Sequence, residues 1–225
     1  MAGAAQAQNS PDAQRVLNRA RAASGGAGWN TIRGLHEKGD DADGHYERWT
    51  DPIRYGDRTA IRTAAGEFVQ GYNGAYEWRI LLNGAVTGSV DPALTARIRT
   101  EAFLAAYAYF FPSRFDLRSV NLGQRRSRDR HFDVLRVQPA GGAPRELWFD
   151  RATGLLGMVV DETGPRRVTV ELSDYRKVGP VMIPFQTVTY GADLVPRRRR
   201  VESIEFSALD RNLFTLSPER VHQKR

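Results

Sequence analysis

Alternating apolar and polar positions run through two long stretches of the chain and predict β-strands. Before residue 82, for example, Tyr76, Trp78 and Ile80 alternate with Glu77 and Arg79. The same period of two resumes after residue 112 and continues toward the end of the chain. Because successive side chains of a strand point to opposite faces, this pattern predicts about five antiparallel strands in the first stretch and six or seven in the second.

Turn signals divide these stretches, and a short helix precedes them. Asn73-Gly74 is a strong hairpin signal, because both residues tolerate the positive φ of a tight turn. Ser10 and Pro11 suit the N-cap and first turn of a helix, and Ser24-Gly25-Gly26 is expected to end it. The apolar stripe of this helix consists of Val16, Leu17 and Ala20.

One long helix is predicted between the two strand-rich stretches. Asp91 is its expected cap, Pro92 lies in its first turn, and Pro112 stops it. Its second half, residues 102–111, is apolar on every side, and such a helix must be surrounded. Ten residues are too few to span a bilayer, so we expect the surroundings to be protein, or protein with an apolar ligand.

These elements predict an α+β fold, with a large curved antiparallel sheet of about eleven or twelve strands forming a half-barrel around the apolar helix. No internal repeat and no Ser/Gly-rich linker divides the sequence. We therefore expect a single domain over residues 10–225, preceded by a disordered tail over residues 1–9.

The aromatic residues of the second helix are the leading candidates for binding. We expect an apolar cavity for acyl chains or a similar guest, which would bind through burial of apolar area. The alternative is that the same side chains simply fill the core. The candidate lining residues are Trp49, Trp78, Phe103, Leu104, Tyr107, Phe110 and Phe111.

The sequence indicates no catalytic chemistry. It contains no cysteine, and none of its four histidines forms an H-E-x-x-H pair. It also lacks a G-x-S-x-G nucleophile elbow and a phosphate-binding glycine loop. We therefore expect no catalytic residue, no metal and no cofactor.

Basic residues outnumber acidic ones by 33 to 26, and the whole excess of +7 follows residue 112. Two dense runs, Arg125–Arg130 and Arg197–Arg200, contribute most to it. We interpret them as solvated loops, with an anionic surface as the alternative partner. Specific nucleic-acid binding is not expected, because neither run lies in a recognisable reading motif. The candidate contacts to an anionic surface are Arg126, Arg128, Arg198 and Arg199.

The first residues indicate export. Residues 2–8 are small residues with the A-x-A character of a signal-peptide cleavage site. We expect a periplasmic protein whose signal peptide has been removed, with an Ala/Gln-rich tail of a cytosolic protein as the alternative.

Four stretches of sequence resemble motifs of the LolA-like, or bacterial lipoprotein-carrier, superfamily. The segment 71–78, GYNGAYEW, is similar to that family's G-Y-D-G-x-x-x-W strand turn. The segment 147–156, LWFDRATGLL, resembles its late hairpin, and 174–185, DYRKVGPVMIPF, resembles its D-Y-R-x-V-x-G-x-x-x-P strand. Leu213-Phe214 resembles the family's closing phenylalanine.

The resemblance implies a curved antiparallel sheet with helices in its concave face, and a noncatalytic protein that handles lipids or lipidated proteins in the periplasm, with peripheral membrane contact. Related domains precede retropepsin-like aspartic proteases, and this chain particularly resembles those. Since the sequence contains no D-T-G motif, the alternative implied function is a protein-interaction or targeting module of a larger exported protease, with a filled core and no ligand.

Overall fold

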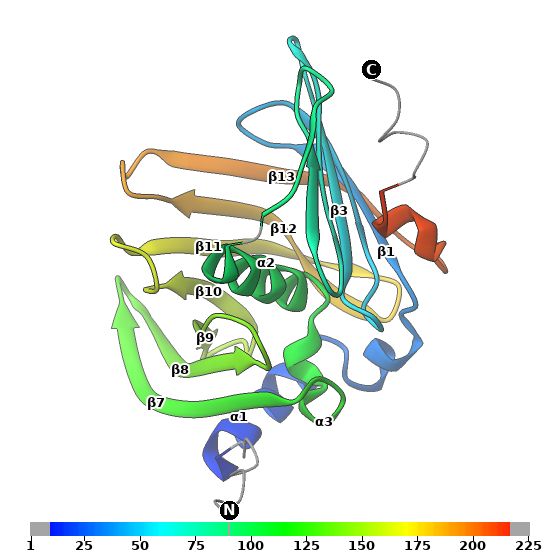
Figure 1. Ribbon diagram of the computed structural model, residues 1–225. Coiled ribbons are helices and arrows are strands. Elements are labelled where there is room, and N and C mark those ends of the chain that lie inside the picture. The colour runs from blue at the N-terminus through cyan, green and yellow to red at the C-terminus, as the bar shows by residue number, and fades with distance from the viewer. Residues whose placement is uncertain (1–9, 90, 217–225) are drawn as a thin grey trace, which may run out of the picture. The chain divides into compact units, whose positions relative to one another are not determined.

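The protein forms one open antiparallel sheet with a few short helices, as seen in a computed structural model that describes residues 10–89 and 91–216 (Figure 1). The sheet has 13 strands in the order β6-β5-β4-β3-β2-β1-β13-β12-β11-β10-β9-β8-β7. This architecture confirms the α+β class and the large antiparallel sheet predicted from the sequence. The strand count exceeds the predicted eleven or twelve because of β6, a two-residue strand at Val86–Thr87 that is too short to give an alternating pattern.

The strands are β1 (Leu35–Asp40), β2 (His45–Thr50), β3 (Gly56–Thr63), β4 (Gly66–Asn73), β5 (Glu77–Ile80), β6 (Val86–Thr87), β7 (Leu117–Ser127), β8 (Arg130–Pro139), β9 (Arg145–Asp150), β10 (Leu156–Asp161), β11 (Val168–Val178), β12 (Val181–Tyr190) and β13 (Pro196–Phe206). The helices are α1 (Pro11–Ala23), α2 (Pro92–Ala105) and α3 (Pro112–Phe115), with 3-10 turns η1 (Gly26–Thr31), η2 (Ala108–Phe110) and η3 (Arg211–Phe214).

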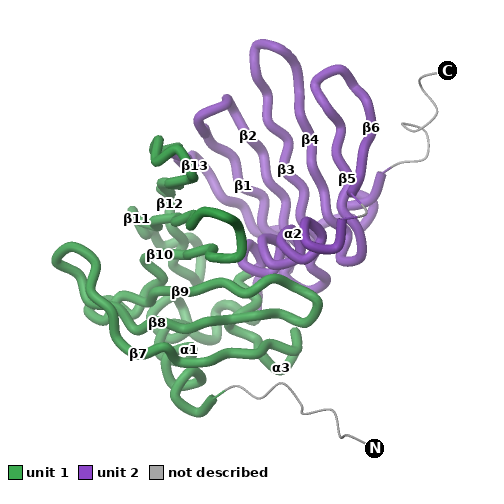
Figure 2. Tube along the Cα trace, turned by 60° about the vertical axis from the view of Figure 1, so that its left-hand side comes forward, with its two compact units in different colours: residues 1–30, 107–197 green, residues 31–106, 198–225 purple. Residues whose placement is uncertain are grey.

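The chain divides into two compact units (Figure 2). Unit 1 comprises residues 1–30 and 107–197, and unit 2 comprises residues 31–106 and 198–225. The assignment of residues 10–225 to a single domain stays a prediction, and the expected tail over residues 1–9 lies outside the described residues.

Unit 1 contains α1 and strands β7 to β12. Ser10 caps α1 by accepting a hydrogen bond from the Ala13 amide at 3.2 Å, as its sequence predicts. The predicted stripe is buried, and the helix ends at Ser24. A compact core lies on one face of β8, β9 and β10, formed by Phe132, Val134, Trp148, Met158 and Val160.

Unit 2 contains β1 to β6, most of β13, and α2, which lies against β3 and β4. The hairpin predicted at Asn73-Gly74 joins β4 to β5. Gly74 has a φ of 95°, and the side chain of Asn73 accepts hydrogen bonds from the amides of Ala75 and Tyr76 at 3.0 Å. The turn is therefore built by the two residues that the sequence singles out.

The predicted helix over residues 92–111 is wrong after Ala105. Asp91 caps α2 as expected, but the helix ends at Ala105, and Tyr107 adopts a left-handed backbone with a φ of 52°. Aromatic side chains lose rotamer freedom in a helix, and four of residues 107–111 are aromatic. The ring of Tyr107 instead lies 4.4 Å from that of Trp29. Stacking of Tyr107 against Trp29 thus outweighs the helical conformation that the apolar run favours.

Both faces of the β3–β4–β5 segment are covered. The face opposite α2 carries Trp78, whose ring nitrogen donates a hydrogen bond to the Phe214 carbonyl at 2.8 Å. The indole lies across Gly71, its cross-strand partner on the same face. A β-carbon on Gly71 would clash with this ring, so the glycine makes room for the tryptophan.

We predict that Gly71→Ala lowers the free energy of unfolding by about 1–3 kcal/mol, because the indole held by Phe214 cannot retreat from the added methyl group. Urea unfolding measures this loss. Gly164→Ala is the matched control, since its β-carbon would meet nothing closer than 3.7 Å. Equal stability of the two variants would contradict the close contact between the Trp78 indole and Gly71.

Candidate functional site

The seven candidate ligand residues are divided between the two units. Trp49, Trp78, Phe103 and Leu104 belong to unit 2, and Tyr107, Phe110 and Phe111 belong to unit 1. Within unit 2, α2 contributes Phe103, which is 0% exposed and stacks on Tyr55 at 6.0 Å between ring centroids. Leu104, its neighbour on the helix, is half-buried.

Trp49 and Trp78 lie on the face of the sheet that points away from α2. The cross-strand pairs Trp49–Arg58 and Gly71–Trp78 place both indoles on one face. Tyr72 lies on the opposite face and borders α2 in a small pocket. The structure therefore does not bring these two tryptophans together with Phe103. The sequence could not predict this, because strand alternation groups side chains on one face of a sheet but does not tell which face a helix covers.

In unit 1, the segment after α2 forms an aromatic cluster. The ring of Trp29 lies 4.4 Å from Tyr107 and 5.5 Å from Phe110. Phe110 is buried, whereas Tyr107 and Phe111 are half-buried. The ring of Phe111 also faces two guanidinium groups, those of Arg21 at 4.8 Å and Arg114 at 4.6 Å. The cluster thus combines an apolar surface with the positive charges of Arg21 and Arg114, which lie against the ring of Phe111.

A small pocket lies between α2 and the strands of unit 2. Its volume is about 20 Å³, which holds about one water molecule and no acyl chain. Its acidic character comes from Asp57 and Glu77 on the strands and Glu101 on α2. The pocket is lined by Asp57, Gln70, Gly71, Tyr72, Glu77, Ile98 and Glu101.

A half-buried ion pair lies on the same face of the sheet. The Arg48 guanidinium donates to both carboxylate oxygens of Asp57, at 2.8 and 3.0 Å, and Thr50 donates to Asp57 at 3.0 Å. Burial opposes the charge of Arg48, but the Asp57 carboxylate outweighs it, so the pKa of Arg48 lies above its ordinary value. The sequence analysis missed this pair, since the two residues meet only through the register of β2 and β3.

Tyr46 extends this polar network. Its hydroxyl donates to the Glu37 carboxylate at 2.5 Å, and the Arg199 guanidinium lies 4.3 Å from the centre of its ring. Burial and the neighbouring Glu37 carboxylate raise the pKa of Tyr46, so the phenol stays neutral. The face of unit 2 that meets α2 is thus more polar than the sequence predicts.

One group of possible metal ligands occurs among the described residues. Asp40, His45 and Glu202 each place one ligand atom within 4.8 Å of the others. His45 and Asp40 face each other across β1 and β2 and form an ion pair through the ring nitrogen Nδ1. The sequence analysis did not group these residues, because Glu202 comes from β13, far along the chain.

The arginine runs lie mostly on strands, which corrects their interpretation as loops: Arg197–Arg200 belongs to β13, and Arg125–Arg130 spans the hairpin between β7 and β8. Arg126 lies near the end of β7, and Arg128 in the turn that follows pairs with Glu171 at 3.3 Å. Arg198 is exposed at the start of β13, and Arg199 pairs with Asp41 at 3.2 Å. Period-two alternation is hidden when every position is arginine, so the pattern gave no strand signal there.

Comparison with known proteins identifies the fold. No family model matches the sequence, and no curated protein matches it significantly. The structure is similar to that of a DUF1329 family protein from Desulfovibrio piger, with a TM-score of 0.61 and 11% identity, covering 90% of this chain and 96% of that one. It is also similar to a LolA superfamily protein from Nitrosomonas europaea, with a TM-score of 0.57 and 13% identity, covering 90% and 97%.

The chain therefore has a LolA-like fold, as its sequence motifs predict. The likeness extends over nine-tenths of the chain and is one of architecture, since few residues are identical. In the described parts of the chain, no helix is long and apolar enough to cross a membrane.

We predict that Asp57→Asn lowers the free energy of unfolding by about 1.5–3 kcal/mol, because it removes the counter-ion and the charge-assisted hydrogen bonds of the half-buried Arg48. Urea unfolding at pH 7 measures the change. The control is Asp174→Asn, which breaks an exposed pair with Arg176 and should cost less than about 0.5 kcal/mol. A similar loss in both variants would show that the Arg48–Asp57 pair contributes no more to stability than an exposed pair does.

Proposed function

We propose that this protein binds a lipid, the acyl chains of a lipidated protein, or a similar apolar ligand in the periplasm, without catalysing a reaction. The observation that carries the proposal is the LolA-like fold, which extends over nine-tenths of the chain. The resemblance of four sequence segments to lipoprotein-carrier motifs supports the same class of ligand. The export signal expected from residues 2–8 accords with this compartment.

The half-buried members of the candidate set are the groups that meet a ligand first. Trp49, Leu104, Tyr107 and Phe111 keep part of their apolar surface open to water, and covering it releases free energy at about 25 cal/mol per Å². Phe103 and Phe110 are closed off in this conformation. We infer that they support the binding surface and contact a ligand only after local opening.

The backbone at Tyr107 favours a binding role for this segment. A tyrosine in left-handed backbone is strained, and such strain is concentrated at functional sites. The turn at Tyr107 brings its ring next to Trp29 and leads into Phe110 and Phe111. The strain is thus associated with an aromatic surface that is partly open.

A second candidate function is that of a protein-interaction or targeting module, such as one serving an aspartic protease domain. The complete burial of Phe103 and the one-water pocket beside α2 favour it, since both describe a filled interior in unit 2. This candidate predicts that no apolar probe binds.

Displacement of a fluorescent fatty acid distinguishes the two functions. We expect saturable binding at micromolar probe, weakened at least about tenfold by Leu104→Asp and by Tyr107→Asp, because each places a charge where the acyl chain is buried. Aspartate tolerates left-handed backbone, so the second variant leaves the turn at residue 107 intact.

The matched controls are Leu81→Asp in unit 2 and Val120→Asp in unit 1, both at exposed apolar positions away from the candidate set. They should bind the probe as the wild type does. Circular dichroism checks that all four variants are folded. Absence of saturable binding by the folded wild type would refute the carrier function and leave the interaction module.

A further inference from the structure

Two apolar side chains project at the turn between β12 and β13. Leu194 is 74% exposed and Val195 is 56% exposed, the two highest values among the large hydrophobic residues that the structure describes. Single exposed leucines are common on protein surfaces, but adjacent apolar residues at the end of a hairpin expose a contiguous apolar tip. We call residues 191–195 the hairpin tip.

The hairpin tip has a defined backbone. The amide of Leu194 donates to the Gly191 carbonyl at 3.1 Å, and the amide of Val195 donates to the Asp193 carboxylate at 3.2 Å. Leu194 itself has a φ of 57°, in the left-handed region that favours glycine or asparagine. Folding alone would favour one of those residues, so an exposed leucine held in this conformation indicates a role for its side chain.

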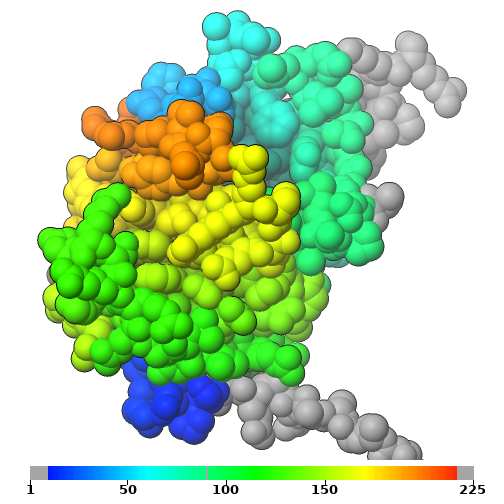
Figure 3. All heavy atoms as spheres, turned by 90° about the vertical axis from the view of Figure 1, so that its left-hand side faces the viewer, coloured from blue at the N-terminus to red at the C-terminus, as the bar shows by residue number. Residues whose placement is uncertain are grey.

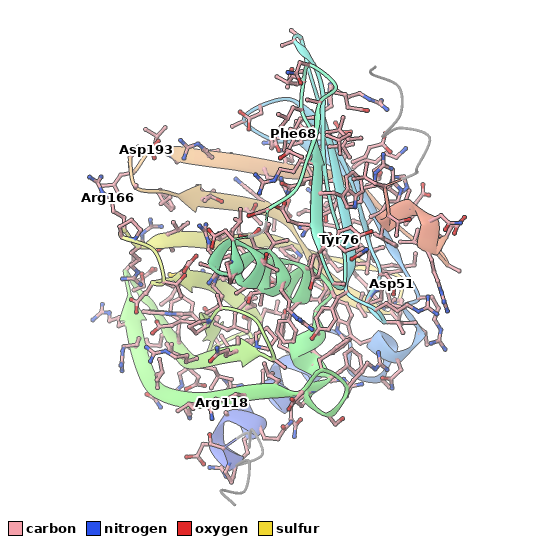
Figure 4. The ribbon with its side chains drawn as sticks, in the orientation of Figure 1. Asp51, Phe68, Tyr76, Arg118, Arg166 and Asp193 are labelled. Atoms are coloured by element: carbon pink, nitrogen blue, oxygen red, sulfur yellow. The ribbon has the colours of Figure 1, made fainter. Side chains whose placement is uncertain are left out.

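Arginines lie beside the apolar tip. Arg166 from the β10–β11 turn donates to the Ala192 carbonyl at 2.9 Å, so the two turns lie side by side. Figure 4 shows Arg166 and Asp193 at the same margin of the molecule, and Figure 3 shows both turns on the face toward the viewer, in yellow and orange. Arg197 and Arg198 follow the tip after Pro196.

The carboxylates of this region neutralise only part of that charge. Asp193 is engaged by Arg197 at 2.5 Å, and Glu162 is the exposed carboxylate of the β10–β11 turn. Arg167 in the same turn and Arg198 are also exposed. The region around the tip therefore keeps a net positive charge.

We propose that the hairpin tip docks on a bilayer containing anionic phospholipids, with Leu194 and Val195 entering the acyl region and Arg166, Arg197 and Arg198 contacting the phosphates. An apolar tip with guanidinium groups beside it matches the two regions of such a bilayer, an apolar acyl interior and an anionic headgroup surface. A nucleic acid would match the charges but not Leu194 and Val195. This docking surface is separate from the ligand site of the proposed function and does not depend on it.

Vesicle flotation tests the proposal with the full chain. We expect binding to vesicles of phosphatidylglycerol and phosphatidylcholine, little binding to pure phosphatidylcholine, and a steep fall with salt. The double variant Leu194→Asp/Val195→Asp should weaken binding at least about tenfold. Its matched control is Leu82→Asp/Val86→Asp, at residues 49% and 38% exposed on another hairpin, which should bind as the wild type does.

A second variant, Arg166→Gln/Arg198→Gln, should weaken binding to anionic vesicles and flatten its salt dependence. The proposal is overturned if the wild type binds no anionic vesicle, if both aspartate double variants lose binding equally, or if pure phosphatidylcholine binds as well. It is also overturned if an oligonucleotide binds as tightly as the vesicles and is unaffected by Leu194→Asp/Val195→Asp. Fatty-acid displacement by that variant should match the wild type, which separates this test from that of the ligand site.

Discussion

The covering of both faces of β3, β4 and β5 is the constraint on which unit 2 depends. An antiparallel sheet with one solvated face needs apolar residues on the other face alone. Here α2 covers one face, while Trp78 and its hydrogen bond to Phe214 close the other. Gly71 leaves room for Trp78 on the face opposite α2, and the Arg48–Asp57 pair lies on the face that α2 covers. The charges of Arg48 and Asp57 are acceptable on this face because each neutralises the other.

Much of the fold was predictable from local patterns, whereas the site was not. Capping at Ser10 and Asp91 and the turn at Asn73-Gly74 are encoded within a few residues, so the sequence predicts them. The end of α2 depends on Tyr107 meeting Trp29 from a distant segment, which no periodicity records. The face occupied by Trp78 likewise depends on where α2 lies. The apolar-cavity hypothesis rested on the length of this helix and on the face that carries Trp78, and tertiary contacts decide both.

The apolar run 102–111 serves two structural roles instead of one. Its first part closes unit 2 around Phe103, and its second part builds the aromatic cluster of unit 1. The turn at Tyr107 is the point where these roles change.

The open order of the sheet leaves β7 as a long edge strand, for which β8 is the one neighbouring strand. Unpaired edges are templates on which another chain can add a strand, and aggregation follows. The last third of β7 carries Arg125 and Arg126, and Arg128 follows at the turn. Two copies that approached edge to edge would bring these like charges together. The arginine run thus has a protective value of its own, keeping molecules of this protein apart whatever else it contacts.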